Sequence, residues 1–272
     1  MLSRKIRIEK PQALKGVLLL LMLLFGAVFL VSAAQLYRLT QDYFTAGSLY
    51  TSLAEQYAKG SHMIPEFTEA SVGEGETQEA YVSPIDFEGL RAINPDVVAW
   101  VYIPGTDIDY PVVHTDDNET YLNTTFDGKG NRCGAIFMDY LNARDLSDRN
   151  VILYGHHMRN GSMFAQLNRF KQEAFFRENR EVWVFTPTRS YQLIIIATYA
   201  QRADIRIRRV QFDEEAEFQQ YLQWICGNSY FDVPFEPSDV EQLFTLGTCS
   251  YEWGNTRTWV HAVCLKEKVV MP

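Results

Sequence analysis

The chain has 272 residues, of which 47% are hydrophobic and 14% aromatic, enough to build one sizeable core. Its net charge is −9, but residues 1–16 carry +4, which leaves −13 for the remainder. An acidic body lacks the basic face that replaces phosphate counterions, so we expect no nucleic-acid partner. The four cysteines form no CxxC pair, and His156 and His157 are adjacent rather than spaced for one metal ion. We therefore expect no metal site.

Residues 17–31, VLLLLMLLFGAVFLV, form an uncharged apolar run that, with its neighbours, reaches the roughly 20 residues of a membrane-spanning helix. The basic residues lie on its N-terminal side. By the positive-inside rule, residues 1–13 form a cytoplasmic tail, residues 14–34 anchor the chain in the cell membrane as a single span, and the rest is extracellular. The competing interpretation is a cleaved signal peptide, because Ser32-Ala33-Ala34 suits a signal peptidase.

Residues 35–83 connect this span to the globular part. Leucine and tyrosine recur at helical spacing between Leu36 and Lys59 and predict a helix, which is either a stalk or packed on the domain. Residues 71–80, SVGEGETQEA, are acidic and almost without large apolar groups, a composition typical of a linker. We expect one catalytic domain over residues 84–272.

The globular part consists of short strand-like runs with a few helices between them. Turn signals such as Pro104-Gly105 separate the runs. Many short strands with inserted helices indicate a mainly β barrel or sandwich. The pattern predicts helices over residues 85–93, 162–179 and 214–226, and strands over residues 97–103, 108–114, 135–138, 151–154, 182–186, 191–199 and 258–265, with a further strand leading into Cys249.

Candidate catalytic residues gather around the stretch 243–257, LFTLGTCSYEWGNTR. An apolar run leads into Cys249, and Arg257 follows eight residues later, after a predicted turn. A thiol and a guanidinium would therefore lie on neighbouring strands. Another strand-like run ends at a glycine and presents His156. A thiol attacks a carbonyl as thiolate, and His156 can supply the base that forms it. Arg257, always charged, suits a substrate carbonyl or an oxyanion.

These residues also have ordinary structural interpretations. A lone cysteine is often a small buried hydrophobe, and Arg257 could form a surface salt bridge with Glu252. The hydroxyl of Thr248 is a further candidate oxyanion donor, but threonine is also a common strand residue.

Two more histidines lie near the candidate site. His157 would point away from His156 if the strand continued, so only one of the two can face the cysteine. His261 alternates with Arg257 on one strand face, as a neighbour of the site or as a half-buried strand residue. A catalytic Cys249 must stay free, and we predict no structural disulfide among the remaining cysteines.

The three motifs together resemble the sortase family, specifically class B sortases. TLGTC with an arginine eight residues later, and YGHHM within SDRNVILYGHHMRNGSMF, match the family's TLxTC, downstream Arg and upstream His in the same order. INPDVVAWVYIPGTDIDYPVV is similar to the class B opening segment. The resemblance covers about residues 85–268. It implies a sortase-type closed β-barrel with an N-terminal helical segment and a helix between the late strands, over residues 214–226.

The resemblance also implies an activity, that of a membrane-anchored cysteine transpeptidase of a Gram-positive bacterium. Such an enzyme cleaves a C-terminal sorting signal of a secreted protein, NPxTx-like in class B, through a thioester. It passes the acyl group to an amine of a peptidoglycan precursor or a pilin. By position, Cys249 is the nucleophile, His156 the general acid/base and Arg257 the substrate- and transition-state-binding residue. Class A sortases use calcium through an acidic loop; this chain shows no equivalent cluster, and we expect no cofactor.

The residues around the nucleophile are expected to form the substrate-binding or oxyanion surroundings: Thr248, Gly247 and Ser250. Gly247 stands where class B sortases often have serine, and glycine offers a backbone but no hydroxyl. Residues 199–210, YAQRADIRIRRV, form either a groove wall or a solvated basic strand.

Two other functions stay open at this point. One is an extracellular cysteine hydrolase of cell-wall peptides, in which water is the main acceptor. The other is a catalytically inactive, membrane-anchored binding protein with a sortase-like fold.

Overall fold

The computed structural model describes residues 12–58, 81–202, 205–250 and 256–265. The chain divides into two compact units, residues 1–45 and residues 46–272. The predicted linker over residues 71–80 lies outside the described residues, as do the turn between Cys249 and Arg257 and most of the basic tail.

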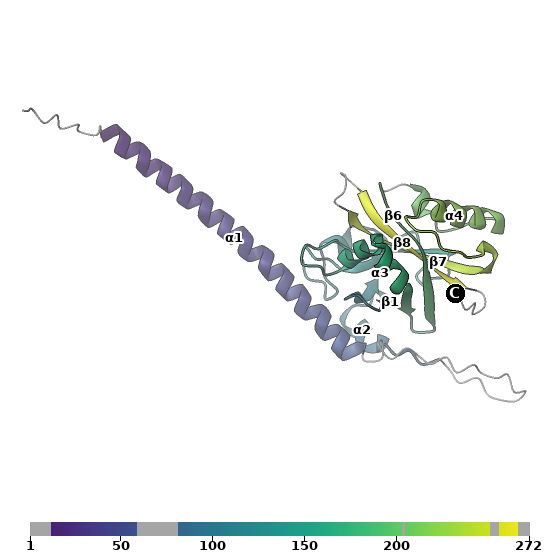
Figure 1. Cartoon of the computed structure of the whole chain (residues 1–272). Helices are drawn as coiled ribbons and strands as arrows, with labels where there is room; N and C mark the ends of the chain where they lie inside the picture. Colours follow the sequence, from purple (N-terminus) through teal and green to yellow (C-terminus); the bar gives the residue numbers. More distant parts are fainter. Residues whose placement is uncertain (1–11, 59–80, 203–204, 251–255, 266–272) are drawn as a thin grey trace, which may run out of the picture. The chain divides into compact units, whose positions relative to one another are not determined.

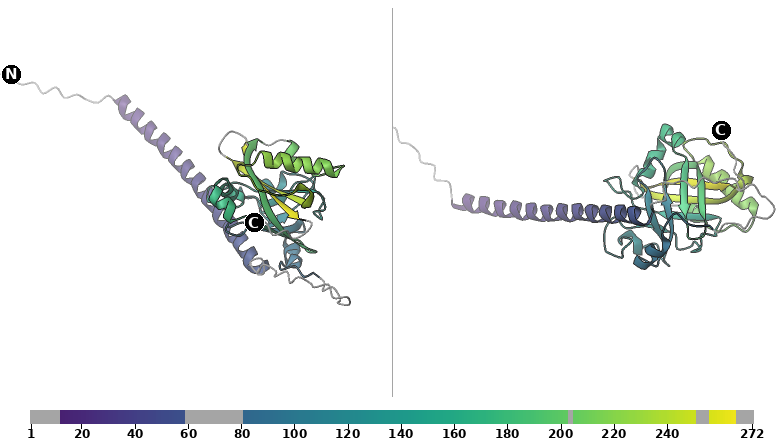
Figure 2. Two further views of the ribbon diagram at one scale, coloured as in Figure 1. Left: turned by 45° about the vertical axis from the view of Figure 1, so that its right-hand side comes forward. Right: turned by 90° about the horizontal axis from the view of Figure 1, so that it is seen from below.

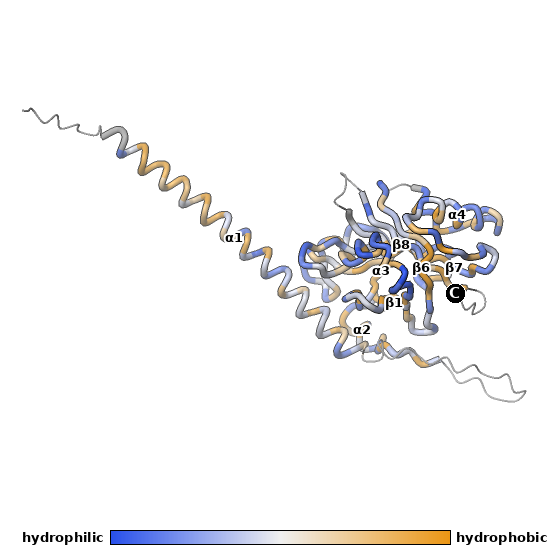
Figure 3. The backbone as a smooth tube through the Cα atoms, in the orientation of Figure 1, coloured by the Kyte–Doolittle hydropathy of each residue, from blue (hydrophilic) through white to orange (hydrophobic). Residues whose placement is uncertain are grey.

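Helix α1 (Gln12–Tyr57) is continuous and contains the apolar run of the sequence (Figure 1). The side chains of residues 17–31 are exposed, and the colouring of Figure 3 shows their apolar character along the N-terminal half of α1. Within the described ranges, α1 is the one helix long and apolar enough to cross a membrane. This is consistent with a single-pass anchor, because exposed leucine and phenylalanine along a whole helix suit lipid rather than water.

The C-terminal turns of α1 belong to the second unit and pack on the barrel. Ala46, Tyr50 and Leu53 are buried at helical spacing. The hydroxyl of Tyr50 donates to the Gly134 carbonyl at 2.6 Å and accepts from the Phe126 amide at 3.3 Å. Of the two arrangements considered for this helix, a free stalk or a packed helix, the packed one is therefore found from residue 46 onward.

The second unit is built around a closed eight-stranded β-barrel, which confirms the predicted barrel with inserted helices (Figure 2). The strand order is β1-β2-β3-β4-β7-β8-β6-β5, and β5 returns to β1. The pairs β2–β3 and β4–β7 are parallel, and the others are antiparallel. The strands are β1 (Val97–Tyr102), β2 (Asp109–Val113), β3 (Ile136–Met138), β4 (Asn150–Tyr154), β5 (Glu181–Phe185), β6 (Ser190–Arg202), β7 (Val240–Ser250) and β8 (Thr256–Leu265).

Helices and 3₁₀ turns fill the connections between the strands. Helix α2 and helix α4 match the predicted helices over residues 85–93 and 214–226. The bounds of these elements are α2 (Phe87–Ile93), η1 (Thr120–Leu122), η2 (Phe164–Lys171), α3 (Glu173–Glu178), η3 (Ile205–Arg208), α4 (Glu215–Gly227) and η4 (Pro237–Asp239).

Two segments differ from the sequence expectation. The single helix expected over residues 162–179 is instead the 3₁₀ helix η2 followed by α3, because Gln172 between them has an extended backbone, with φ −96° and ψ 121°. Phe164, Leu167 and Phe170 are buried at a spacing of three, which is the repeat of a 3₁₀ helix. Residues 199–210 are not one basic strand, since β6 ends at Arg202 and η3 follows.

Candidate active site

Strand β7 brings the three motifs of the sequence together. It pairs antiparallel with β8, so that Cys249 lies opposite Arg257 and Gly247 lies opposite Trp259. On its other edge β7 runs parallel to β4, with Tyr154 beside Gly247, and the Gly155 amide donates to the Gly247 carbonyl at 3.2 Å. Strand β7 thus places Cys249 opposite Arg257 and, two residues earlier, places Gly247 beside the residue before His156. The side chains of residues 249 and 250 lie outside the described part of the structure.

Glycine is required at position 155, where the chain leaves β4. A Cβ there would lie 2.4 Å from Cδ1 of Ile136 and 2.7 Å from Cγ of Phe164. Real Cβ contacts are not this short, so any side chain would push the loop away from the barrel. The glycine of the YGHH motif therefore allows the next residue, His156, to stay close to β7.

His156 is half-buried and has a defined hydrogen-bond partner. Its Nε2 lies 2.6 Å from the carbonyl oxygen of Leu122, at the end of η1. A carbonyl oxygen only accepts, so Nε2 carries the hydrogen in this bond. The His156 carbonyl also accepts from the Phe164 amide at 3.0 Å. His156 is held at both its ring and its backbone.

His157 has different partners from His156, but β4 ends at Tyr154, so the continuing strand on which the expectation of opposite directions depended is not found. Its Nδ1 lies 3.3 Å from Nδ2 of Asn168, and Oδ1 of Asn168 accepts from the Thr258 hydroxyl at 2.6 Å. These contacts tie the loop after β4 to η2 and to β8, on the strand face opposite to that of Arg257.

Arg257 is half-buried, and its guanidinium lies over an aromatic ring. Its Cζ is 5.7 Å from the ring centroid of Tyr154, the last residue of β4. Among the described residues Arg257 makes no ion pair, and Glu252 lies outside them. The Tyr154 ring is in turn 6.3 Å from the ring of Trp259 and 5.4 Å from that of Phe137. An aromatic platform thus supports the guanidinium.

Steric crowding by Trp259 explains why position 247 holds a glycine in this chain. A Cβ there would lie 2.5 Å from Cζ3 and 3.0 Å from Cε3 of Trp259, which is 1% exposed. The indole covers the position where a serine side chain would stand. Glycine at position 247 therefore leaves room for the large side chain of Trp259.

Thr248 faces away from Gly247. It is 1% exposed, it lies opposite Thr258, and its hydroxyl oxygen is buried without a hydrogen-bond partner in the described structure. Since side chains alternate along a strand, this hydroxyl is on the other face from positions 247 and 249. An oxyanion contact from Thr248 would have to come from its backbone. Ser250 pairs with Thr256 at the end of β7.

His261 is a buried structural residue. It is fully buried, Nδ1 lies 3.0 Å from the Thr245 hydroxyl, and Nε2 lies 3.0 Å from the Tyr199 hydroxyl. Burial lowers the pKa of His261 to about 3, so it stays neutral. It shares a strand face with Arg257, but the half-buried position considered for it is wrong, because His261 is 0% exposed.

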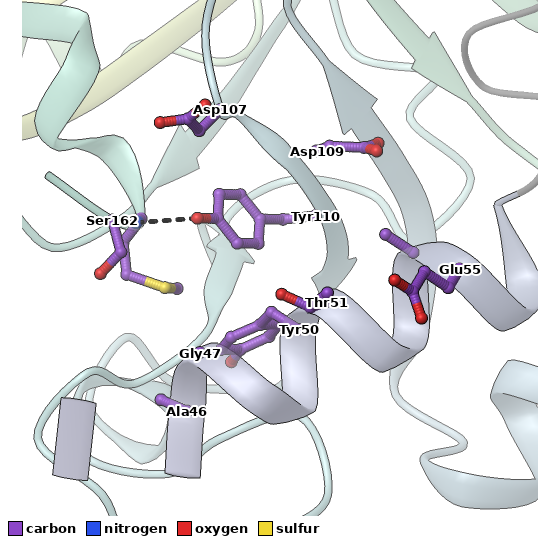
Figure 4. A pocket seen from close by; sticks show the side chains of 11 residues that line it. Ala46, Gly47, Tyr50, Thr51, Glu55, Asp107, Asp109, Tyr110 and Ser162 are labelled. Atoms are coloured by element: carbon purple, nitrogen blue, oxygen red, sulfur yellow. Dashed lines mark hydrogen bonds between the residues drawn. The ribbon is translucent and has the colours of Figure 1, made fainter. Parts of the chain in front are cut away.

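A cavity of about 390 Å³ lies behind the loop that carries His156, between α1 and β2. Figure 4 shows Tyr50, Thr51 and Glu55 of α1 on one side and Asp107, Asp109 and Tyr110 on the other. The hydroxyl of Tyr110 accepts from the Met163 amide at 3.1 Å, which braces this loop.

Groups of histidine, cysteine and carboxylate side chains that could hold a metal ion are not found among the described residues. In the same part of the chain Cys226 and Cys264 are free thiols, and Cys133 is buried. Burial raises the pKa of Cys226 to about 12, which leaves this thiol protonated and unreactive.

Three features of the site carried no usable signal in the sequence. The Leu122 carbonyl is a backbone group, and any residue could supply it. Tyr154 and Trp259 are aromatic residues in apolar runs, as is common in strands, although Tyr154 is part of the YGHH motif. Knowledge of the pairing of β4 with β7 was needed to recognise them as the platform for Arg257.

Comparison with known proteins agrees with this geometry. A family model described as the sortase domain matches residues 101–264. Sortase B of Listeria monocytogenes is 32% identical over 167 residues, covering 61% of this chain and 68% of the relative. The structure of a Staphylococcus aureus sortase B–substrate complex superposes with a TM-score of 0.68 at 28% identity, covering 83% of this chain and 99% of that one.

A structure of sortase B complexed with triglycine superposes with a TM-score of 0.62 at 32% identity, covering 69% of this chain and 88% of that one. The sortase model covers more than half of the chain, and both the relative and the two structures are class B enzymes. The chain therefore belongs to the sortase family of cysteine transpeptidases, as a class B sortase.

Proposed function

We propose that this sortase cleaves an NPxTx-like sorting signal of secreted proteins and transfers the acyl group to a cell-wall or pilin amine. The observation that carries the proposal is the register of β7, which sets Cys249 opposite Arg257 and joins Gly247 to the residue before His156. The solved class B structures, one with substrate and one with triglycine, support a peptide donor and an amine acceptor.

The roles follow from the chemistry of the three side chains. The Cys249 thiolate attacks the carbonyl carbon of the threonine in the signal, and Arg257 stabilises the oxyanion that forms. The C–N bond breaks as protonated His156 gives a proton from Nδ1 to the departing amine, leaving a thioester on sulfur. The acceptor amine then attacks the thioester, loses a proton to His156, and releases Cys249.

The location of the enzyme is part of the proposal. We infer that residues 14–34 of α1 span the cell membrane, that residues 1–13 stay in the cytoplasm, and that the barrel unit is extracellular. The apolar, exposed first unit and its basic flank support this orientation. A membrane-bound barrel would meet secreted substrates as they leave the membrane.

The test is a product analysis of the full chain in detergent micelles. NPxTx and LPxTG peptides are incubated with and without triglycine, and products are identified by mass. We expect the NPxTx peptide joined to triglycine, and no product from Cys249→Ala. Release of the free acid in the presence of triglycine would indicate a hydrolase, and no cleavage of either peptide would contradict the proposal.

A further inference from the structure

Asp139 is a buried carboxylate beside the catalytic strands. It directly follows β3 and is fully buried. An isolated ionised carboxylate in such a position would be strongly unfavourable, so its partners determine what it does. It has no part in the chemistry assigned above.

The side-chain partners of Asp139 come from two different parts of the barrel unit, and a backbone amide adds a third contact. Arg208 of η3 binds it with two hydrogen bonds, Nε to Oδ2 at 2.8 Å and Nη2 to Oδ1 at 3.0 Å. The Tyr154 hydroxyl donates to Oδ2 at 2.8 Å, and the Leu141 amide donates to Oδ1 at 3.0 Å. Burial by itself would raise the pKa of Asp139, but these hydrogen bonds outweigh it and lower the pKa, so the group is charged.

The first connection leads to Arg257. Tyr154 is the residue whose ring lies 5.7 Å below the Arg257 guanidinium, and it is two residues before His156. Its hydroxyl is held by Asp139, which fixes the direction of the ring axis, and the neighbouring rings of Phe137 and Trp259 restrict rotation of the ring about that axis. Because oxyanion and substrate contacts depend on sub-ångström placement, the orientation of this ring matters for the position of Arg257.

The second connection leads to the segment 205–210 between β6 and β7. Asn150 of β4 donates to the Arg209 carbonyl at 2.9 Å, and the Tyr221 hydroxyl donates to the Ile207 carbonyl at 3.0 Å. Arg208 adds a bidentate ion pair to these neutral contacts, with a side chain 34% exposed against 0% for Asp139. Such a pair fixes direction as well as distance.

We propose that Asp139 is a positioning residue of the transfer site, which holds the Tyr154 ring under Arg257 and fastens the segment 205–210 beside β4. The proposal rests on the assignment of Arg257 to substrate and oxyanion binding. The two connections have separate consequences. The ring supports Arg257 in the transition state and hence affects kcat. The proposal assigns the segment 205–210 to a wall of the peptide groove, one of the two interpretations considered for residues 199–210, so its placement affects KM.

The test compares four variants of the full chain, normalised by titration of reactive Cys249. Tyr154→Phe keeps the ring but removes its hydrogen bond, and we expect kcat to fall at least fivefold with KM within twofold. Arg208→Gln should raise KM at least fivefold with kcat within twofold. Asp139→Asn should show both changes. Arg209→Gln is the matched control, because Arg209 is in the same segment but pairs at the surface with Glu217 of α4, the two side chains being 41% and 40% exposed, and it should change neither constant.

A merely structural role would reduce the fraction of titratable enzyme and leave both constants per active site unchanged. That result for Asp139→Asn overturns the proposal. If Asp139→Asn does not fold, Tyr154→Phe and Arg208→Gln still test the proposal. The proposal is contradicted if Tyr154→Phe does not lower kcat alone or if Arg208→Gln does not raise KM alone.

Hydrogen exchange gives an answer that does not need turnover. Amides 205–210 should exchange faster in Arg208→Gln and Asp139→Asn but not in Arg209→Gln. If the parent enzyme cleaves no sorting peptide, the proposed function fails while this measurement still tests the fastening of the segment. Unchanged amide exchange in both Arg208→Gln and Asp139→Asn would refute the proposed fastening of the segment 205–210.

Discussion

Substitution of Gly247 by serine should destabilise this chain. The new Cβ would stand 2.5 Å from the Trp259 ring, and an indole that is 1% exposed has little room to move. Overpacking of this kind costs about 1–3 kcal/mol. At roughly 2–4 °C per kcal/mol for a unit of this size, we expect a Tm lower by about 2–12 °C.

The assay is thermal unfolding of the full chain in micelles, followed by circular dichroism. Gly130→Ser is the matched control, because a Cβ at Gly130 has nothing within 4 Å, and it should stay within about 0.5 kcal/mol of the parent. In a Trp259→Leu background the cost of Gly247→Ser should shrink, with a coupling of about 0.5–3 kcal/mol. Equal costs in both backgrounds, or no cost at all, would refute the steric explanation.

Three further predictions follow from the geometry. Tyr50→Phe leaves the Gly134 carbonyl and the Phe126 amide without the hydroxyl, and should cost about 1–3 kcal/mol in urea unfolding; an unchanged midpoint would show that the end of α1 is not packed as described. His261 stays neutral when folded, with a pKa of about 3, but takes up a proton below its ordinary value of 6.5 when unfolded. Its contribution to stability is thus complete above pH 6.5 and falls by about 1.4 kcal/mol per pH unit below it, down to pH 3. His261→Gln should lose this part of the pH dependence in unfolding experiments at pH 7.5 and 5.0, and an identical slope would contradict the assignment. Arg257→Lys keeps the charge but not the planar fork, and should lower kcat about 10²–10³-fold in peptide transfer assays; wild-type rates would rule out a specific guanidinium contact.

Local pattern accounts for the parts of the fold that were predicted from sequence. Strands such as β1 and β4 are uninterrupted apolar runs between turn residues, and α4 has helical spacing of its buried side chains. The proximity of Cys249 and Arg257 followed from a turn between two apolar runs, and the register of β7 with β8 confirms that these positions are opposite each other.

The remaining features depend on contacts between distant segments. The 3₁₀ form of residues 164–171 arises because three side chains at a spacing of three are buried together, and the sequence alone resembles an α-helix there. The ion pair between Asp139 and Arg208 joins residues that are 69 positions apart, and neither stands in a recognisable motif. The buried position of His261 likewise depends on Tyr199 from another strand.

The most direct test of the central claim is the intact mass of the full chain during turnover. With an NPxTx peptide and no amine, we expect the mass of the acyl fragment added to the protein, on Cys249 when mapped by proteolysis, and its disappearance when triglycine is added. Cys249→Ala should show no added mass. An adduct on another residue, or product formation by Cys249→Ala, would contradict the account.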